Sequence, residues 1–326
     1  MIGLLHDGAT ENDGGNGWSC PQAPCAFSPL AFFLRNVHHA AVTARHISFT
    51  VAPDDAGLRL DQLLAKRVPE LSRRTARKVL LIGGVFVERA RVKIASKLTQ
   101  PGQKVDVHLG GALDTVTAAE KTAPPELDIL FEDEHLLVVD KPAKLAVAAT
   151  RESDRHNLLH YLSLRPSSPQ LHLVHRLDLG TSGLLVVAKT AEAAHRLSEL
   201  FRVHDLERVY RLAVIGDLPG ARTVDEPIGD RPARTVFNPV EQKPGLTLAE
   251  ARLETGRTHQ IRLHALTMGH PVLGDRRYGR PTEHDPPRLA LHARVLGFRH
   301  PTTGETMRFE REWPADLQDW WQGTAE

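Results

Sequence analysis

Two apolar runs separated by a short polar loop constrain the fold of this chain more than any other feature. One run spans residues 171–174 and the other spans 184–188. Runs of this kind are typical of buried strands, and the Gly-Thr-Ser-Gly sequence at 180–183 is typical of a tight turn. Asp178 therefore lies on a loop held by two strands, which is where catalytic groups usually lie.

Length and composition predict a two-domain globular protein. The chain has 326 residues, of which 41% are hydrophobic and 25% are charged. No run approaches the ~18 apolar residues of a membrane helix, and the acidic residues near the N-terminus argue against a signal peptide. The two cysteines, Cys20 and Cys25, are too few for a disulfide scaffold or a zinc site. This usage indicates a cytoplasmic protein.

The positive charge is concentrated in one segment. The whole chain has a formal net charge of only +1, but Arg59 to Lys97 contains eleven Lys or Arg and three Asp or Glu. This segment therefore carries +8, and the remainder of the chain is net acidic. Such an asymmetry indicates a basic binding module beside a more neutral catalytic body.

A basic helix is expected at the centre of this segment. Ser72 is a suitable N-cap for a helix over 73–82, and Gly83-Gly84 would end it. Its basic residues share one face, opposite a face of apolar residues. A solvated charged face is the ordinary alternative, but the helix has no acidic residues for i,i+4 pairs, which favours contact with a polyanion. The predicted RNA-binding residues are Arg59, Arg73, Arg74, Arg77 and Lys78.

The order of elements predicts an α+β fold. The domains are expected at 1–45, a disordered extension; 46–110, a small α/β RNA-binding module; 111–125, a linker; and 126–326, the catalytic domain. In the last of these, strands outnumber helices and follow one another through turns, which is typical of a mixed, largely antiparallel sheet. Strands are predicted at 171–174, 184–188, 208–215, 246–254 and 289–296, and helices at 191–203 and about 258–268.

Asp178 has basic residues nearby in the sequence and a further candidate partner downstream. An Asp in a turn often caps local backbone amides, and this is the ordinary interpretation. However, Arg176 lies two residues away, and Arg262 belongs to a second polar cluster at 256–264. We expect Arg262 to approach Asp178 as a partly buried ion pair. A carboxylate held ionised in this way serves as a nucleophile or a base.

The remaining candidates have ordinary interpretations. Tyr210 lies on a predicted strand, and by itself it is typical of a core aromatic residue with a hydrated hydroxyl. His259 and His264 are five residues apart and lack the spacing of a zinc protease, so hydrogen-bonding roles are expected and no metal is predicted. The chain has neither a phosphate-binding glycine loop nor a Gly-x-Ser-x-Gly motif. No cofactor is predicted.

These motifs together resemble the RluA family of RNA pseudouridine synthases from about Leu127 to Leu317. Asp140-Lys141-Pro142-Ala143, His175 to Gly183, Arg208-Val209-Tyr210 and Gly256 to His264 match its motifs in order. Residues 58–109 are similar to the αL-type RNA-binding module of a ribosomal protein. The chain departs from the family at Asp140, where Asn is usual, and at Lys144 and Ala148, where Gly and His are common. These departures bear on loop geometry and target choice.

The resemblance implies that uridine in structured RNA is isomerised to pseudouridine without a cofactor, and large-subunit ribosomal RNA is the expected substrate. It implies that Asp178 is the nucleophile, that Tyr210 stacks on the base and acts as general base, and that Arg262 pairs with Asp178. Arg176, Leu263, His175 and Thr181 are the expected substrate-binding residues. Transfer RNA is the alternative substrate. A non-catalytic RNA-binding or ribosome-assembly protein and a metal-dependent hydrolase are the rival functions. A monomer is expected.

Overall fold

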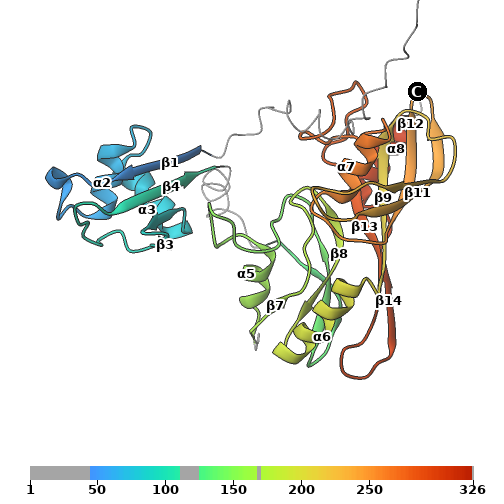
Figure 1. Cartoon of the computed structure of the whole chain (residues 1–326), viewed down its shortest axis with the longest axis horizontal. Helices are drawn as coiled ribbons and strands as arrows, with labels where there is room; N and C mark the ends of the chain where they lie inside the picture. Colours follow the sequence, from blue (N-terminus) through green and yellow to red (C-terminus); the bar gives the residue numbers. More distant parts are fainter. Residues whose placement is uncertain (1–44, 111–124, 167–169, 325–326) are drawn as a thin grey trace, which may run out of the picture. The chain divides into compact units, whose positions relative to one another are not determined.

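The computed structural model describes residues 45–110, 125–166 and 170–324, and these form two separate sheets (Figure 1). The predicted N-terminal extension at 1–45 and the predicted linker at 111–125 lie almost entirely outside the described residues. Within those residues, no helix is long and apolar enough to cross a membrane. The two sheets fall within the predicted module and the predicted catalytic domain.

The first sheet has the strand order β1-β4-β2-β3 and is antiparallel. It packs against two helices around a core that includes Leu63, Leu80 and Val105. As predicted, Ser72 caps the basic helix by accepting a hydrogen bond from the backbone amide of Thr75. The elements are β1 (Arg45–Thr50), η1 (Pro53–Asp55), α2 (Leu60–Arg67), α3 (Arg73–Ile82), β2 (Val85–Val87), β3 (Ala90–Arg91) and β4 (Lys104–Leu109).

The second sheet has ten strands, ordered β10-β11-β12-β9-β13-β8-β6-β5, with β14 beside β13 and β7 beside β8. Among its described ladders only β8 and β13 run parallel, which confirms the predicted mixed, largely antiparallel α+β fold. Its strands are β5 (Asp128–Glu132), β6 (Leu136–Lys141), β7 (His172–Leu173), β8 (Ser182–Ala188), β9 (Glu207–Ile215), β10 (Arg222–Asp225), β11 (Arg234–Lys243), β12 (Leu246–Leu253), β13 (Leu291–Arg299) and β14 (Thr306–Glu310).

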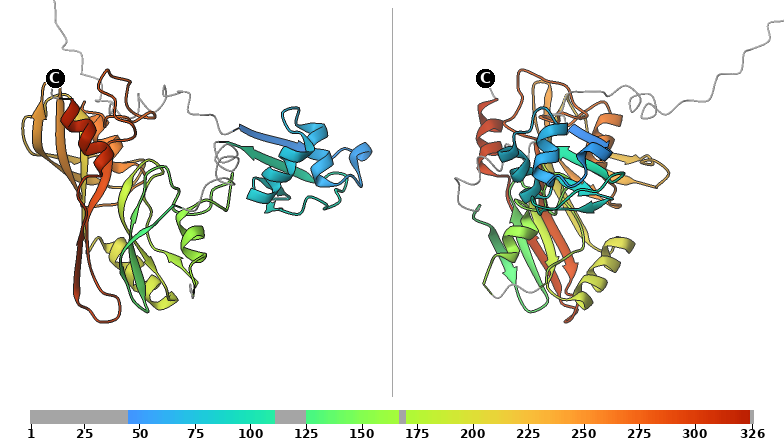
Figure 2. Two further views of the ribbon diagram at one scale, coloured as in Figure 1. Left: turned by 180° about the vertical axis from the view of Figure 1, so that it is seen from behind. Right: turned by 90° about the vertical axis from the view of Figure 1, so that its left-hand side faces the viewer.

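Helices cover both faces of this sheet (Figure 2). Alternate residues of β6 and β8 point to opposite faces, so that α5 packs on Leu185 and α6 packs on Leu184. In the other half, α7 packs on Leu212 of β9 and α8 packs on Ala213. The helices are α5 (Leu158–Ser163), α6 (Ala191–Val203), α7 (Gln260–Thr267) and α8 (Ala315–Gly323). The two halves meet along β8, β13 and β9.

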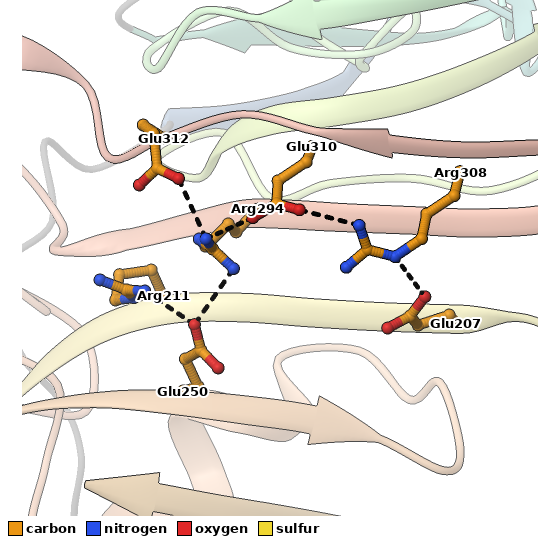
Figure 3. A network of polar contacts seen from close by, with 7 residues as sticks. All are labelled: Glu207, Arg211, Glu250, Arg294, Arg308, Glu310 and Glu312. Atoms are coloured by element: carbon orange, nitrogen blue, oxygen red, sulfur yellow. Dashed lines mark hydrogen bonds and ion pairs between the residues drawn. The ribbon is translucent and has the colours of Figure 1, made fainter. Parts of the chain in front are cut away.

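The middle of the sheet carries charge on one face. Glu207 and Arg211 lie on one face of β9, and Tyr210 lies on the opposite face. The side chains of Glu207 and Arg211 belong to an ion-pair network across four strands (Figure 3). Arg294 lies at its centre, 3.3 Å from Glu250 and within ion-pair distance of Glu310. Tyr210 lies on the other face of β9, together with buried Leu212.

The sequence-based predictions identified the longer elements and missed several shorter ones. The helices over 73–82 and 191–203 begin and end where predicted, and all five predicted strands of the catalytic domain are present, shifted or shortened by a few residues. The strands β10, β11 and β14 and the helices α5 and α8 were not predicted. Much of β11 is exposed on alternate residues and interrupted by a bulge at Pro239, so its apolar periodicity is weak.

Candidate active site

Asp178 lies on the loop between β7 and β8, as predicted. Buried Leu177 anchors the loop, and the Asp178 carbonyl accepts a hydrogen bond of 3.1 Å from the Thr181 amide, which closes the turn. The Leu179 carbonyl accepts a second bond, of 2.8 Å, from the backbone amide of Lys144. The Asp178 side chain remains 24% exposed. The loop is therefore held by its backbone, while the carboxylate remains partly accessible.

Gly183 brings this loop close to the strand that carries Tyr210. It has φ +114°, and a Cβ at this position would lie 2.3 Å from the Ala293 carbonyl oxygen. Only glycine permits this approach of β8 to β13. Ala293 pairs with Gly183 on one side and with Tyr210 on the other, so these residues form one row across three strands. The parallel pairing thus places the Asp178 loop beside β9.

Arg262 joins Asp178 to a second carboxylate. Its Nη1 donates to Asp178 Oδ2 at 3.0 Å, and its Nε and Nη2 donate to the two oxygens of Asp275 at 2.7 Å each. The side chain of Arg262 is 10% exposed and that of Asp275 is 1% exposed. The predicted ion pair is therefore present. Because the guanidinium is held by the fork to Asp275, its remaining edge points at Asp178.

The two buried partners keep each other charged. Burial alone would lower the pKa of Arg262, but the hydrogen bonds and charges of Asp275 and Asp178 outweigh it and raise the pKa. Burial would raise the pKa of Asp275, and Arg262 outweighs it and lowers the pKa. The backbone amides of Arg277 and Tyr278 also donate to Asp275 Oδ1. The sequence did not predict this role of Asp275.

His259 lies on the other side of the Asp178 carboxylate. Its Nε2 is 3.7 Å from Asp178 Oδ1, and its Nδ1 is 2.8 Å from the hydroxyl of Tyr278. Burial lowers the pKa of His259, which favours the neutral ring. In the tautomer protonated on Nε2, Nδ1 accepts from Tyr278 and the N–H faces Asp178. The expected hydrogen-bonding role of His259 is confirmed, and its closeness to Asp178 was not anticipated.

Tyr210 lies between two apolar clusters, one on α7 and one on α5. Burial raises its pKa to about 12, and the charge of Asp178 acts in the same direction. The phenol is therefore protonated at neutral pH.

Comparison with known proteins identifies the family. The model of the RNA pseudouridylate synthase family matches residues 135–267, a range that includes Asp178, Tyr210 and Arg262. Ribosomal large subunit pseudouridine synthase D of Nitrosomonas europaea is 38% identical over 300 residues, covering 83% of this chain and 86% of that protein. The chain belongs to the RNA pseudouridylate synthase family. It is therefore an RNA pseudouridine synthase, an isomerase.

Other pseudouridine synthases support this assignment. Ribosomal large subunit pseudouridine synthase C of Yersinia pestis is 34% identical over 303 residues, covering 82% of this chain and 92% of that protein. Among solved structures, human RNA pseudouridylate synthase domain containing 1 superposes with a TM-score of 0.51 at 25% identity. The superposition covers 59% of this chain and 85% of that one.

The other predicted substrate-binding residues have different environments in this pseudouridine synthase. Arg176 is exposed on the Asp178 loop, whereas Leu263 and Thr181 are buried. His175 accepts a hydrogen bond from the Val186 amide and stacks on the Phe201 ring at 4.3 Å. Burial lowers its pKa to about 3, so the ring is neutral. These contacts show His175 and Thr181 supporting the loop, and their binding of substrate stays a prediction.

The departures from the family pattern lie at the end of β6 and on the loop after it. Lys144 has φ +65°, the left-handed region where glycine is favoured, which explains why Gly is common at this position. Burial raises the pKa of Asp140, which stands where Asn is usual. The neighbouring Lys141 is buried and donates to the carbonyls of Pro142 and Leu145, and burial lowers its pKa to about 7.

The predicted RNA-binding side chains of the basic module are arranged by a buried carboxylate. Asp61 is fully buried, and it accepts hydrogen bonds from Arg59 at 3.1 Å and from Arg77 at 2.7 Å, with Arg73 at 3.5 Å. The expectation of an uncompensated face was wrong in this respect, because Asp61 belongs to α2 and not to α3. Arg73, Arg74, Arg77, Lys78 and Leu81 line a hollow of about 430 Å³.

Proposed function

We propose that this enzyme isomerises specific uridines to pseudouridine in large-subunit ribosomal RNA, with Asp178 as the nucleophile. The proposal rests on one observation above all, the forked contact of Arg262 Nε and Nη2 with Asp275, which leaves Nη1 to donate to Asp178. The substrate follows from the relatives, which include several enzymes named ribosomal large subunit pseudouridine synthase. Because the proposed substrate is ribosomal RNA, we place the enzyme in the cytoplasm. We also propose that it acts as a monomer.

The reaction breaks the N1–C1′ bond of uridine and forms a C5–C1′ bond, with loss of the C5 proton and gain of a proton at N1. Asp178 attacks either the sugar at C1′ or uracil at C6, and its partly exposed carboxylate serves for both. Arg262 keeps this carboxylate ionised and aimed. No electrons are gained or lost overall, so the reaction needs no redox cofactor.

Tyr210 stacks on the uracil ring and assists removal of the C5 proton. Its pKa of about 12 means that it acts as a neutral phenol. The phenol oxygen accepts the C5 proton while the phenol gives its own proton to water. Leu263 packs against the base, and exposed Arg176 fills the space that a flipped nucleotide leaves in the RNA.

The basic module contributes affinity rather than chemistry. Its cations line one hollow on α3, and each phosphate contact releases counterions, so binding weakens as salt rises. These contacts offset the few kcal/mol that flipping a nucleotide out of its stack costs.

The test is the Asp178→Asn variant, which keeps the shape of the side chain but removes the charge. We expect no pseudouridine in an unmodified large-subunit ribosomal RNA transcript, and unchanged RNA binding. Asp217→Asn is the matched control, because Asp217 is exposed and outside the site, and it should retain full activity. Activity of the Asp178→Asn variant near that of the wild type would overturn the mechanism.

The substrate is tested by mapping pseudouridines in ribosomal and transfer RNA from a strain that lacks the gene. Loss of pseudouridine from large-subunit ribosomal RNA is the expected result. Loss from transfer RNA alone would replace the proposed substrate, and loss from neither would favour a non-catalytic RNA-binding role.

A further inference from the structure

Arg208 is a buried cation that lacks a carboxylate partner. Its residue is 7% exposed, and it forms no ion pair with any residue in the described part of the chain. Its Nη2 lies 3.4 Å from Nδ1 of His204, and its buried Nε has no hydrogen-bond partner. Burial lowers its pKa. Buried charges are normally paired, and Arg262 in the same domain contacts two carboxylates, so Arg208 is an exception to be explained.

The surroundings of Arg208 are positively charged. Burial lowers the pKa of His204, and the charges of Arg208 and Arg257 lower it further. Arg257 donates from Nε to the Pro232 carbonyl at 3.0 Å and also has no ion pair with a described residue. These three side chains come from β9, from the residue that ends α6, and from the loop before α7.

Gly256 allows the side chains of Arg208 and Arg257 to lie near each other. A Cβ at Gly256 would lie 2.5 Å from Nη1 of Arg208, so a larger residue would force the guanidinium away. Glycine therefore allows the loop that carries Arg257 to close against Arg208. Two arginines held near each other without an acid form a site of high positive potential.

Arg208 lies beside the proposed catalytic residues. It is two residues before Tyr210 on β9, so their side chains share one face of the strand, about 7 Å apart along it. Its charge also acts on the phenol of Tyr210 and on the buried ring of His175. A group bound at Arg208 therefore lies within about one nucleotide of a base stacked on Tyr210.

We propose that Arg208, Arg257 and His204 bind a backbone phosphate of the RNA next to the uridine that reacts. The proposal rests on the proposed function, because it takes Tyr210 as the place of the target base. A uracil carbonyl would use one donor and leave the buried charge uncompensated. A phosphodiester accepts from several N–H donors and neutralises that charge, and a guanidinium fits it in bidentate geometry.

The experiment measures the dissociation constant of a large-subunit ribosomal RNA transcript over a range of KCl concentrations, using Asp178→Asn as the parent so that no turnover occurs. We expect Arg208→Gln and Arg257→Gln each to weaken binding about tenfold. Each should reduce the slope of log K against log salt by about 0.7–0.9. Arg299→Gln is the matched control, because it removes one exposed charge at the far end of β13. It should change neither quantity.

Two further readouts separate binding from folding. Since Arg208 is an unpaired buried charge, Arg208→Gln should melt at the same temperature as the parent or higher. Arg208→Lys keeps the charge without the fork and should retain the salt slope while binding less tightly. A large fall in melting temperature with an unchanged slope would make Arg208 a structural residue and overturn the proposal.

The failure of this proposal and the failure of the proposed function are distinguishable. If Asp178→Asn remained active, the nucleophile would be wrong, but the salt slopes would still report on the phosphate site. If Asp178→Asn were inactive and both arginine variants bound RNA with the slope of the control, the phosphate site would be wrong and the nucleophile would stand.

Discussion

In both the basic module and the catalytic domain a buried aspartate holds arginine side chains in place. The arginines of the module are exposed, whereas the arginine of the catalytic domain is buried. In the module, fully buried Asp61 holds Arg59 and Arg77, whose side chains remain 41% and 54% exposed. In the catalytic domain, Asp275 holds Arg262, which is itself buried and points at Asp178. The first arrangement leaves several cations exposed, whereas the second directs one arginine nitrogen at one carboxylate.

The difference teaches what burial does to an ion pair. Arginines that reach water from a buried acid keep their affinity for other anions, since solvent screens the pair. Arg262 is buried with Asp275, which takes two of its nitrogens, so the third nitrogen, Nη1, orients Asp178. An Asp–Arg pair thus leaves arginines exposed at the surface of the module, whereas in the catalytic domain it orients a neighbouring carboxylate.

The largest effect is expected from Arg262→Met, because it leaves the buried Asp275 without its partner. The free energy of unfolding of the catalytic domain should fall by about 3–5 kcal/mol, and activity should be lost. Arg262→Lys is the control, since it keeps the charge but not the fork, and its loss should be smaller. Thermal melting checks this, and an unaltered melting temperature for Arg262→Met would mean that the pair does not stabilise the fold.

A smaller loss is expected from Asp61→Asn in the module. The arginines that it releases are exposed and become solvated, so the free energy of unfolding should fall by only about 1–3 kcal/mol. Denaturant unfolding measures this value. The RNA salt slope should be retained, because every cation is still present. A loss as large as that of Arg262→Met would erase the distinction between the two sites.

The stabilities of the two regions should also respond differently to a fall in pH. Burial, with the charge of Arg288, lowers the pKa of fully buried His292 to about 4, and in the unfolded chain it is near 6.5. The unfolded state therefore binds the additional proton between pH 6.5 and 4, so stability falls as pH falls through this window, by up to about 1.4 kcal/mol per pH unit.

The buried carboxylates become protonated only at a lower pH than His292. The pKa values of Asp61 and Asp275 are lowered, because their arginine partners outweigh burial, so their stabilisation is lost only below pH 3.8. Hydrogen exchange between pH 6.5 and 4 should show the catalytic domain opening before the module. His292→Gln should reduce this dependence without abolishing it, because buried His175 also has a pKa lowered to about 3. Equal acid sensitivity of the two regions would contradict the assignment.

The smallest effect on stability is expected from Arg74→Gln. Arg74 lines the hollow on α3 and forms no ion pair with the residues that the structure describes. Its replacement should change the free energy of unfolding by less than about 0.5 kcal/mol. It should nevertheless reduce the RNA salt slope by about 0.7–0.9. Filter-binding titrations at several salt concentrations test this, and an unaltered slope would mean that α3 does not contact RNA.

Local sequence predicted the longer elements and the position of Asp178 on a loop between two strands. Ser72 and Gly83 mark the ends of α3 because capping is a short-range interaction. Asp178 was predictable because a polar loop between two apolar runs is also a local pattern. The ion pair with Arg262 was predictable from the residue types once both motifs were recognised.

Only the tertiary structure decided the contacts between distant segments. Asp61 and α3 are brought together by helix packing, so the counter-charge of the basic face was invisible to an argument within one helix. Asp275 and His259 became partners of the Asp178 site through the packing of α7, and Arg208 became an unpaired charge through burial. Burial and pairing depend on which surfaces meet, and a one-dimensional pattern specifies the side chains without specifying their neighbours.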